Sequence, residues 1–311
     1  MSFLEANRLG SKREPFLIIS NFDSSEVSIH PLSTLKDEDI EFQIEENIDL
    51  QRNIEYKKEP ISFKSYEKKF DRVIDSIKKG YTYILNLTSE TPIEVDSNLK
   101  ELYSYAKAKY KLRFKDKFIC YSPETFVNIE NSIISAYPMK GTLDASIPDG
   151  ESILLNSSKE DAEHIMIVDL LRNDLNMVSS GVRVEKFKSI EKIKSGDREL
   201  LQMSSKISGD LSDDWHNNIG TILKTLLPAG SITGTPKKRT VELINEIEDY
   251  DRGFFTGIFG IYDGKSFKSS VMIRFIENRD GKLYYKSGGG ITLDSDSQSE
   301  YRELIDKVYL F

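Results

Sequence analysis

The sequence predicts an α+β fold built on antiparallel sheets, and three observations lead to this class. Apolar runs that read as strands are joined by tight turns at Asp263-Gly264 and Asp280-Gly281, which is typical of hairpins. Helical patterns are mixed irregularly with these hairpins, without a repeating strand–helix–strand unit. The 311 residues are enough for one large domain or two ordinary ones.

The first 60 residues predict a small sheet fragment with loops. Two extended apolar runs, Phe16–Ile19 and Val27–Ile29, are separated by the turn-like segment Asn21–Ser25. An acidic stretch, Lys36–Asp49, follows them. No residue type or spacing in this region indicates chemistry.

From Ser65 onward the hydrophobic period changes, and helices are interspersed with short strands. Apolar residues from Tyr66 to Ile77 recur at helical spacing, and Gly80 is expected to close that helix as a C-cap. Further helices are predicted over Leu99–Tyr110, from Ser157-Ser158 to Leu175, from Thr235-Pro236 onward with Thr235 as N-cap, and over Asp296–Tyr309. Strands are predicted over Tyr81–Thr88, Lys117–Tyr121, Phe126–Ile129, Ile133–Tyr137, Phe254–Tyr262, Phe267–Ile276 and Lys282–Lys286.

The composition is that of a globular protein and excludes several functional classes. Hydrophobic residues make up 38% of the chain, charged residues 30%, and the net charge is −8 without a basic stripe, so we expect no nucleic-acid partner. A local pocket could still bind a small anion. One cysteine, Cys120, and three widely separated histidines provide neither an intramolecular disulfide nor a zinc cluster. No signal pattern or membrane-length apolar run stands out, so we expect a cytoplasmic protein without a membrane partner.

Lys140, in the segment Pro138–Thr142, has two interpretations. A lysine at a strand end before Gly-Thr is most simply a surface residue next to a turn. If its amine instead attacks carbon, it must be neutral, and burial or a nearby cation must lower its pKa from about 10.4. Glu124 lies one hairpin earlier in the sequence and, taken alone, is also a turn residue.

The carboxylates near helix ends also allow two interpretations. Glu160 is explained by a capping box at the helix start, whereas Glu163 lies beyond the capping positions. Glu300, Glu303 and Lys307 share one helix face, because they are spaced by three and four residues. They can form a solvated salt-bridge ladder or a magnesium site, since Mg²⁺ takes oxygen ligands from few carboxylates plus water and substrate.

Two glycine segments could bind a carboxylate through backbone N–H groups. Gly230–Lys237 does not have the spacing of a phosphate loop, and Gly288–Gly290 lacks the context of a dinucleotide site. Both can still present amides to an anion. Arg274, predicted to lie on the strand Val271–Ile276, could add a bidentate clamp.

In this order, the segments resemble the chorismate-utilising enzymes. The matching segments are Ser122-Pro123-Glu124, Pro138–Thr142, Lys159–Asp174, Gly230–Lys237, Ile273-Arg274 and Gly288–Glu303. The family includes component I of anthranilate synthase and of aminodeoxychorismate synthase, and the isochorismate and salicylate synthases. The resemblance covers roughly residues 64–311 and implies antiparallel sheets packed in a sandwich with flanking helices. It implies a chorismate-binding catalytic domain over 64–311, with residues 1–63 as a shortened N-terminal sheet region of the same globule.

Within this family, the lysine at position 140 is similar to that of the aminodeoxychorismate synthases, where anthranilate synthases have alanine. Isochorismate and salicylate synthases use a water-activating lysine on an earlier strand, and that position falls on Ile84 here. The resemblance therefore implies amination of chorismate to 4-amino-4-deoxychorismate, for 4-aminobenzoate and folate synthesis. Three alternatives stay open: an anthranilate-forming enzyme, an isochorismate-forming enzyme, and a non-catalytic chorismate-binding subunit.

The resemblance also implies roles for individual residues. Glu124 would be the general acid at the C4 hydroxyl and Lys140 the nucleophile at C2, before ammonia attacks C4. Magnesium would be held by Glu163 and Glu303, with Glu300 beside them. The substrate-binding positions would be Thr142, Thr233, Gly234, Arg274, Gly288, Gly289, Gly290 and Lys307.

Several positions depart from the family pattern. Gln202 stands where relatives usually have a histidine, so a pyruvate-eliminating reaction is not expected; Ile261 replaces a common tyrosine and Ala229 a common glycine. The short N-terminal region predicts no tryptophan feedback. The chain shows no glutaminase nucleophile constellation, so ammonia is expected from a separate glutamine amidotransferase subunit.

Overall fold

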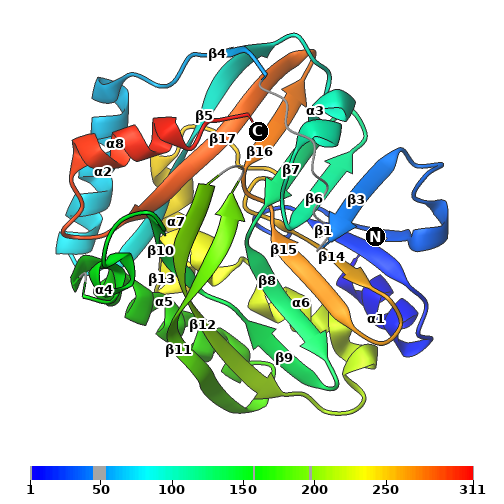
Figure 1. Ribbon diagram of the computed structural model, residues 1–311. Helices are drawn as coiled ribbons and strands as arrows, with labels where there is room; N and C mark the ends of the chain where they lie inside the picture. The colour runs from blue at the N-terminus through cyan, green and yellow to red at the C-terminus, as the bar shows by residue number, and fades with distance from the viewer. Residues whose placement is uncertain (1, 45–53, 157, 196–197, 311) are drawn as a thin grey trace.

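The computed structural model describes residues 2–44, 54–156, 158–195 and 198–310 (Figure 1). The helices are α1 (Phe3–Ser11), α2 (Phe63–Lys78), α3 (Leu99–Tyr105), α4 (Gly150–Leu155), α5 (Ser158–Asn176), α6 (Ile219–Leu226), α7 (Lys237–Ile247) and α8 (Ser297–Asp306), and the 3-10 turns are η1 (Leu32–Thr34), η2 (Trp215–Asn218) and η3 (Gly230–Ile232). The strands are β1 (Phe16–Ser20), β2 (Val27–Pro31), β3 (Ile40–Ile44), β4 (Tyr56–Lys58), β5 (Ile84–Val95), β6 (Tyr110–Phe114), β7 (Phe118–Ser122), β8 (Thr125–Glu130), β9 (Ile133–Ala136), β10 (Met139–Asp144), β11 (Ser180–Ser195), β12 (Arg198–Asp210), β13 (Gly234–Thr235), β14 (Ile258–Tyr262), β15 (Phe267–Val271), β16 (Phe275–Arg279) and β17 (Lys282–Ile291).

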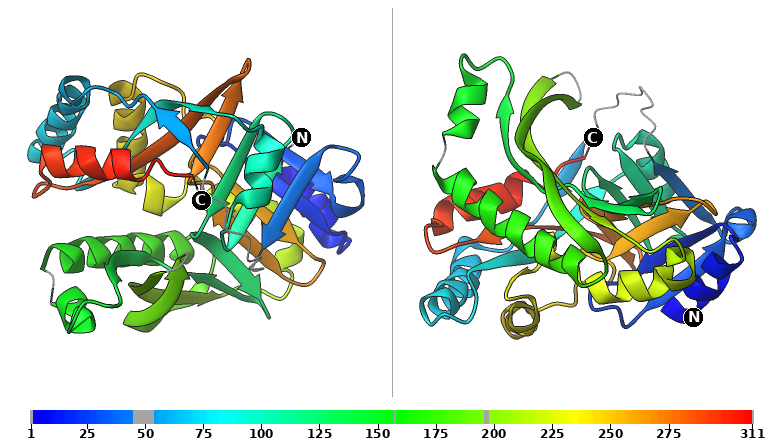
Figure 2. Two further views of the ribbon diagram at one scale, coloured as in Figure 1. Left: turned by 45° about the horizontal axis from the view of Figure 1, so that its top comes forward. Right: turned by 90° about the horizontal axis from the view of Figure 1, so that it is seen from below.

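Two antiparallel sheets carry the fold, which confirms the predicted class. The first has nine strands in the order β10-β12-β9-β8-β15-β14-β1-β2, with β11 on β12. The second has eight strands in the order β13-β5-β17-β16-β7-β6-β3, with β4 on β5. In the left view of Figure 2, α5 and β10–β12 lie below while α8, β5 and β17 lie above. No helix of the described residues is both long and apolar enough to cross a membrane.

The N-terminal strands extend the first sheet. β1 is buried along its whole length and pairs with β2 on one side and β14 on the other. Helix α1 was not anticipated from the sequence; its residues Phe3, Ala6 and Leu9 are buried, and α1 packs on η2 and α6. The strands predicted at Phe16–Ile19 and Val27–Ile29 are thus confirmed, while the domain boundary at residue 63 stays a prediction.

The chain crosses between the two sheets at two adjacent places. β7 belongs to the second sheet and β8 to the first, so Pro123-Glu124 forms one crossing. β15 and β16 are likewise in different sheets, so Met272–Arg274 forms the other. The two crossings are hydrogen-bonded, because Val271 N donates to Glu124 O at 3.2 Å and Tyr121 N donates to Arg274 O at 3.2 Å.

This arrangement corrects the single strand predicted over Phe267–Ile276. The run is two strands, and Arg274 lies between them with φ of 51° instead of within a strand. The run Phe267–Ile276 contains no glycine or proline, so no turn residue marks the crossing between the two sheets.

Other boundaries also differ from the predictions. The helix predicted over Leu99–Tyr110 ends at Tyr105, since Tyr110 begins the fully buried strand β6. Thr235 pairs with Ile84 in β13, so α7 begins at Lys237 with Pro236 as N-cap. The long β11/β12 hairpin was missed. The predicted capping box of α5 lies outside the described residues, since it involves Ser157 and the side chains next to it.

Helix α2 holds α8 in place. As predicted, α2 buries Tyr66, Phe70 and Val73, and its N-cap hydroxyl at Ser62 accepts from Ser65 N. The ring of Tyr301 in α8 lies 5.5 Å from that of Tyr66. α8 therefore presents its remaining face toward β17.

Candidate active site

A cavity of about 520 Å³ contains most of the predicted site. It is lined from β5, β10, α5, η3, β17 and α8, including Ile84, Asn86, Glu124, Met139, Gly141, Glu163, Gln202, Ala229, Ser231, Thr233, Gly234, Gly289, Gly290, Glu300, Glu303 and Lys307. A second cavity of about 240 Å³ adjoins it, because both are lined by Asn86, Glu124, Ser231 and Lys307. The structure thus brings together residues separated by more than 200 positions.

Glu124 stands at the junction of the two cavities. Its backbone is fixed on both sides, since Glu124 N donates to Ser122 Oγ at 3.0 Å and Ser270 Oγ donates to Glu124 O at 2.8 Å. The hydroxyl of Ser231 in η3 donates to Glu124 Oε1. These contacts fix the position of the Glu124 carboxyl on the sheet crossing, beside both cavities.

Lys140 and Thr142 lie on β10 at the edge of the first sheet. Lys140 pairs with Met203 and Thr142 with Gln202, and the register shifts between them at a bulge. Gly141 takes the bulge position with φ of 73°, a conformation that favours glycine. Met139 and Gly141 line the main cavity, which places the backbone of Lys140 at its wall. The side chains of Lys140 and Thr142 lie outside the described part of the structure.

The face of α8 that carries Glu300, Glu303 and Lys307 lies next to Gly289. A Cβ at Gly289 would stand 3.6 Å from Glu300 Oε2, 3.6 Å from Glu303 Oε1 and 3.7 Å from Lys307 Nζ. Glu300 is buried and accepts from Ser295 Oγ at 2.8 Å, while Lys307 Nζ lies 2.7 Å from Glu303 Oε1 and donates to Gly288 O at 2.8 Å. These contacts confirm that the three side chains share one helix face.

The charge of this face affects its surroundings. Burial, followed by the negative charges of Glu300 and Glu303, raises the pKa of the Tyr66 hydroxyl. Glu163, buried on α5, lines the same cavity. A cation and a cationic side chain are therefore the natural partners of this region when it binds an anionic substrate.

The donors present suit magnesium only in combination with substrate. Among the described residues, no three Asp, Glu, His or Cys side chains converge into a preformed metal cluster, although Glu163, Glu300 and Glu303 line one cavity. Glu300 and Glu303 do meet beside Gly289, and Mg²⁺ is often held by one or two carboxylates with waters and substrate oxygens. The oxygen donors fit that mode.

The three glycines lie within β17. The strand predicted from the sequence ended before them, at Lys286. Gly288, Gly289 and Gly290 pair with Thr88, Leu87 and Asn86 of β5. β16 pairs with β17 only as far as Lys286, so the glycines have β5 as their one strand neighbour among the described residues. Their other edge faces the cavities, and the amides there can meet a carboxylate.

The η3 segment forms the wall beside β5. Thr233 is fully buried, and its hydroxyl lies 3.0 Å from Ala229 O and 3.1 Å from Gly230 O. Gly234 has φ of 138°, and a Cβ there would come within 1.9 Å of Ile84 O, so only glycine fits. Thr233 and Gly234 thus line the cavity as predicted positions, with Thr233 also bracing the turn.

Arg274 lines the second cavity instead of the main one. Its guanidinium carbon lies 5.3 Å from the centre of the Tyr309 ring. Lys286 lines the same cavity, and burial lowers the pKa of its ammonium while Glu277, at 3.1 Å, opposes this shift. The Arg274 guanidinium therefore gives the second cavity a positive group next to Glu124, while the charge of Lys286 is balanced by Glu277.

The departures from the family pattern fall in different places. Gln202 and Ala229 line the main cavity, as does Ile84. Ile261 lies in β14 opposite Leu17 and is not among the described residues lining either cavity. Sequence reasoning missed Asn86 and Ser231, although both stood inside segments it had singled out.

A cavity lined from both sheets of an α+β fold, with Glu124, Glu163, Glu300, Glu303 and Lys307 as its charged described residues, is the kind of site in which an enzyme binds a small polar substrate. The chain belongs to the chorismate binding enzyme family, whose model matches residues 17–311. It is therefore an enzyme that acts on chorismate, and the resemblance seen in the sequence is confirmed.

Individual relatives support this assignment. The chain is 46% identical to a protein described as uncharacterized and PabA-like in Pasteurella multocida, over 98% of this chain and 97% of that protein. It is 30% identical to aminodeoxychorismate synthase component 1 of Bacillus subtilis, over 80% of this chain and 55% of that protein. Anthranilate synthase component I from Streptococcus pneumoniae superposes with a TM-score of 0.69 at 28% identity, covering 82% of this chain and 59% of that one.

Proposed function

We propose that this enzyme is an aminodeoxychorismate synthase component I, converting chorismate and ammonia into 4-amino-4-deoxychorismate in the cytoplasm. One observation carries the proposal. β10 brings the backbone of Lys140 to the cavity wall, while the position of a water-activating lysine is taken by Ile84 in the same cavity. This pattern favours an amine nucleophile over activated water.

Glu124 and Lys140 divide the chemistry between them. Glu124 protonates the C4 hydroxyl, which leaves as water, because hydroxide is a poor leaving group. The neutral amine of Lys140 adds at C2, the two ring double bonds shift, and the C4–O bond breaks. Ammonia then attacks C4, the double bonds shift back, and the C2–N bond to Lys140 breaks. Two displacements give net retention and leave the enolpyruvyl ether intact.

The substrate carboxylates are met by different walls in this proposal. The ring carboxylate lies toward Glu163, Glu300, Glu303 and Lys307, where bound Mg²⁺ would neutralise the repulsion between carboxylates. The enolpyruvyl carboxylate is met by Arg274 and the free edge of Gly288–Gly290, and Thr142, Thr233 and Gly234 complete the pocket. The hydroxyl of Ser231, which donates to Glu124 Oε1, would hold the acid toward the C4 side.

Ammonia is proposed to come from a glutamine amidotransferase partner. The Cys120 thiol is buried in β7, and burial raises its pKa, which makes it a poor glutaminase nucleophile. With free ammonium salts at alkaline pH, the purified chain should therefore turn over without that partner.

Mass spectrometry of the chain incubated with chorismate, Mg²⁺ and ammonium tests the proposal. We expect aminodeoxychorismate as product and, on slowed turnover, a covalent adduct that maps to Lys140. Lys140→Ala and Glu124→Gln should each abolish most of the rate, while Lys192→Ala, an exposed lysine on β11, serves as a control. Fluorescent anthranilate would assign the chain to the anthranilate-forming branch, isochorismate would indicate water as nucleophile, and an inert chain would indicate a binding subunit.

A further inference from the structure

Arg252 and Glu248 form a buried ion pair directly behind the cavity wall. Both side chains are almost completely shielded from solvent. The guanidinium donates to both carboxylate oxygens, from Nε to Oε2 at 2.8 Å and from Nη2 to Oε1 at 2.7 Å. This bidentate geometry leaves the outer N–H groups of Arg252 for other partners.

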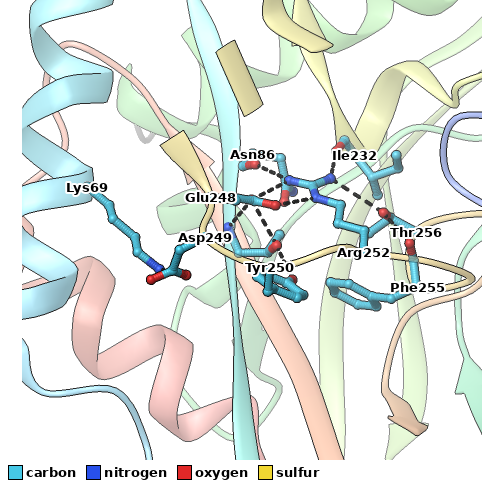
Figure 3. A network of polar contacts seen from close by, with 10 residues as sticks. Lys69, Asn86, Ile232, Glu248, Asp249, Tyr250, Arg252, Phe255 and Thr256 are labelled. Atoms are coloured by element: carbon cyan, nitrogen blue, oxygen red, sulfur yellow. Dashed lines mark hydrogen bonds and ion pairs between the residues drawn. The ribbon is translucent and has the colours of Figure 1, made fainter. Parts of the chain in front are cut away.

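Those outer groups bind two separate segments of the chain (Figure 3). Nη2 donates to Asn86 O of β5 at 2.7 Å, and Nη1 donates to Ile232 O of η3 at 3.0 Å. Glu248 Oε1 in turn accepts from Thr88 N at 2.8 Å and Thr88 Oγ1 at 2.9 Å. The pair thus joins β5 to η3 through charge-assisted hydrogen bonds in a dry environment.

Both joined segments carry residues of the site. Asn86 lines both cavities, and Thr88 is the strand partner of Gly288. Ile232 is flanked by Ser231, which donates to Glu124, and by Thr233, which lines the main cavity. A shift of Ile232 therefore moves the hydroxyl that holds the proposed general acid.

We propose that Arg252 is a positioning residue that sets the gap between β5 and η3, and through Ser231 the place of Glu124. The inference rests on the proposed function for its catalytic readout. It does not follow from the ion pair alone, because a buried pair is often no more stabilising than apolar residues of similar volume. The contacts to Asn86 O and Ile232 O distinguish this pair from a general core element.

Arg252→Lys is the discriminating substitution. A lysine keeps the positive charge beside Glu248 but lacks the planar fork needed to reach the carboxylate and both carbonyls together. We expect kcat/KM for chorismate to fall by about 10- to 100-fold, because misplacements of about 1 Å cost this much. Chorismate affinity, measured by calorimetry, should fall in parallel.

Arg113→Lys provides a matched control. Arg113 is also buried and donates to Asp39, Glu41 and the backbone of Lys115, but it is in β6, outside both cavity linings. The same change there should lower the unfolding temperature and leave kcat/KM within about twofold. Equal losses of activity in the two variants, at temperatures where both are folded, would overturn the proposal.

Glu248→Gln supplies a second test, in which the carboxylate is changed and Arg252 is kept. The amide leaves the donors to Asn86 O and Ile232 O in place while leaving the buried arginine without its counter-charge. Positioning therefore predicts opposite rankings: Glu248→Gln loses more thermal stability and less activity than Arg252→Lys. If the variant that loses more thermal stability also loses more activity, Arg252 has only a structural role. If the wild-type chain binds chorismate but does not turn it over, the proposed function is contradicted. The effect of each variant on the site is then measured by its chorismate dissociation constant in place of its activity.

Discussion

Glu248–Arg252 and Glu303–Lys307 have the same four-residue spacing and opposite environments. The side chains of Arg252 and Glu248 are 2% and 1% exposed, whereas those of Lys307 and Glu303 are 45% and 54% exposed and face the cavity. The first pair has a fixed set of protein partners. The second can exchange its partners for substrate or metal at low cost, because exposed ion pairs contribute little to stability. One pair therefore holds the wall of the site, and the other is available to the ligand.

Breaking the buried pair should give the largest effect in the molecule. Arg252→Met alone leaves Glu248 buried and uncompensated, so the free energy of unfolding should fall by about 3–5 kcal/mol. The double variant Glu248→Leu with Arg252→Met should recover much of that loss while activity stays low. Chemical denaturation of the three proteins measures the comparison, and full recovery of activity in the double variant would contradict it.

Changing the exposed acid should affect chemistry and leave stability nearly unchanged. Glu303→Gln is expected to lower the rate by about 100-fold and to raise the Mg²⁺ concentration needed for half-maximal activity. The unfolding free energy should change by less than about 1 kcal/mol. A magnesium titration of the initial rate provides the measurement, and an unchanged titration would remove Glu303 from the metal site.

Two neighbouring glycines of β17 have different surroundings: Gly288 packs against the backbone of β5, and Gly289 lies beside the charged side chains of α8. A Cβ at Gly288 would stand 2.4 Å from Leu87 O, so Gly288→Ala should cost about 1–3 kcal/mol of stability. A Cβ at Gly289 would meet Glu300, Glu303 and Lys307 only at ordinary contact distances, so Gly289→Ala should fold normally. It should nevertheless weaken chorismate binding by filling the space beside the acids. Thermal unfolding and chorismate binding should be measured on both variants. If Gly289→Ala is the less stable of the two, Gly288 is not the glycine that the fold requires.

The smallest effect on folding is expected at Lys307. Lys307→Met removes an exposed ion pair and a hydrogen bond to Gly288 O, so the unfolding free energy should move by about 0.5 kcal/mol or less. The KM for chorismate should rise, since the cavity loses a cation. Steady-state kinetics measures the change in KM, and chemical denaturation measures the change in unfolding free energy. A stability loss as large as that of Arg252→Met would show that the Glu303–Lys307 pair is as important for folding as the Glu248–Arg252 pair.

The sequence predicted what depends on local pattern. The helix face of Glu300, Glu303 and Lys307 follows from spacing, and the turn at Asp280-Gly281 follows from residue type, with φ of 53° and 85°. The family motifs predicted which segments meet, and the cavity brings most of them together.

The same reasoning could not find features set by distant partners. The four-residue spacing of Glu248 and Arg252 does not predict their burial, because the partners of Arg252 in β5 and η3 lie more than 15 residues away in sequence. The place of Arg274 was misjudged for a related reason. Strand pattern reports burial, and it contains no signal for which sheet a buried strand joins.

The sheet crossings have a consequence for protein engineering. At the Asp280-Gly281 turn, β16 and β17 belong to one sheet, and a side chain built on Gly281 would meet nothing within 4 Å. Added residues there lengthen a surface hairpin. At Met272–Arg274 an added residue would change the length of the connection between the two sheets, beside the hydrogen bond from Val271 to Glu124. Tags and fused domains therefore belong at the first position, and the crossings should be treated as fixed-length connections.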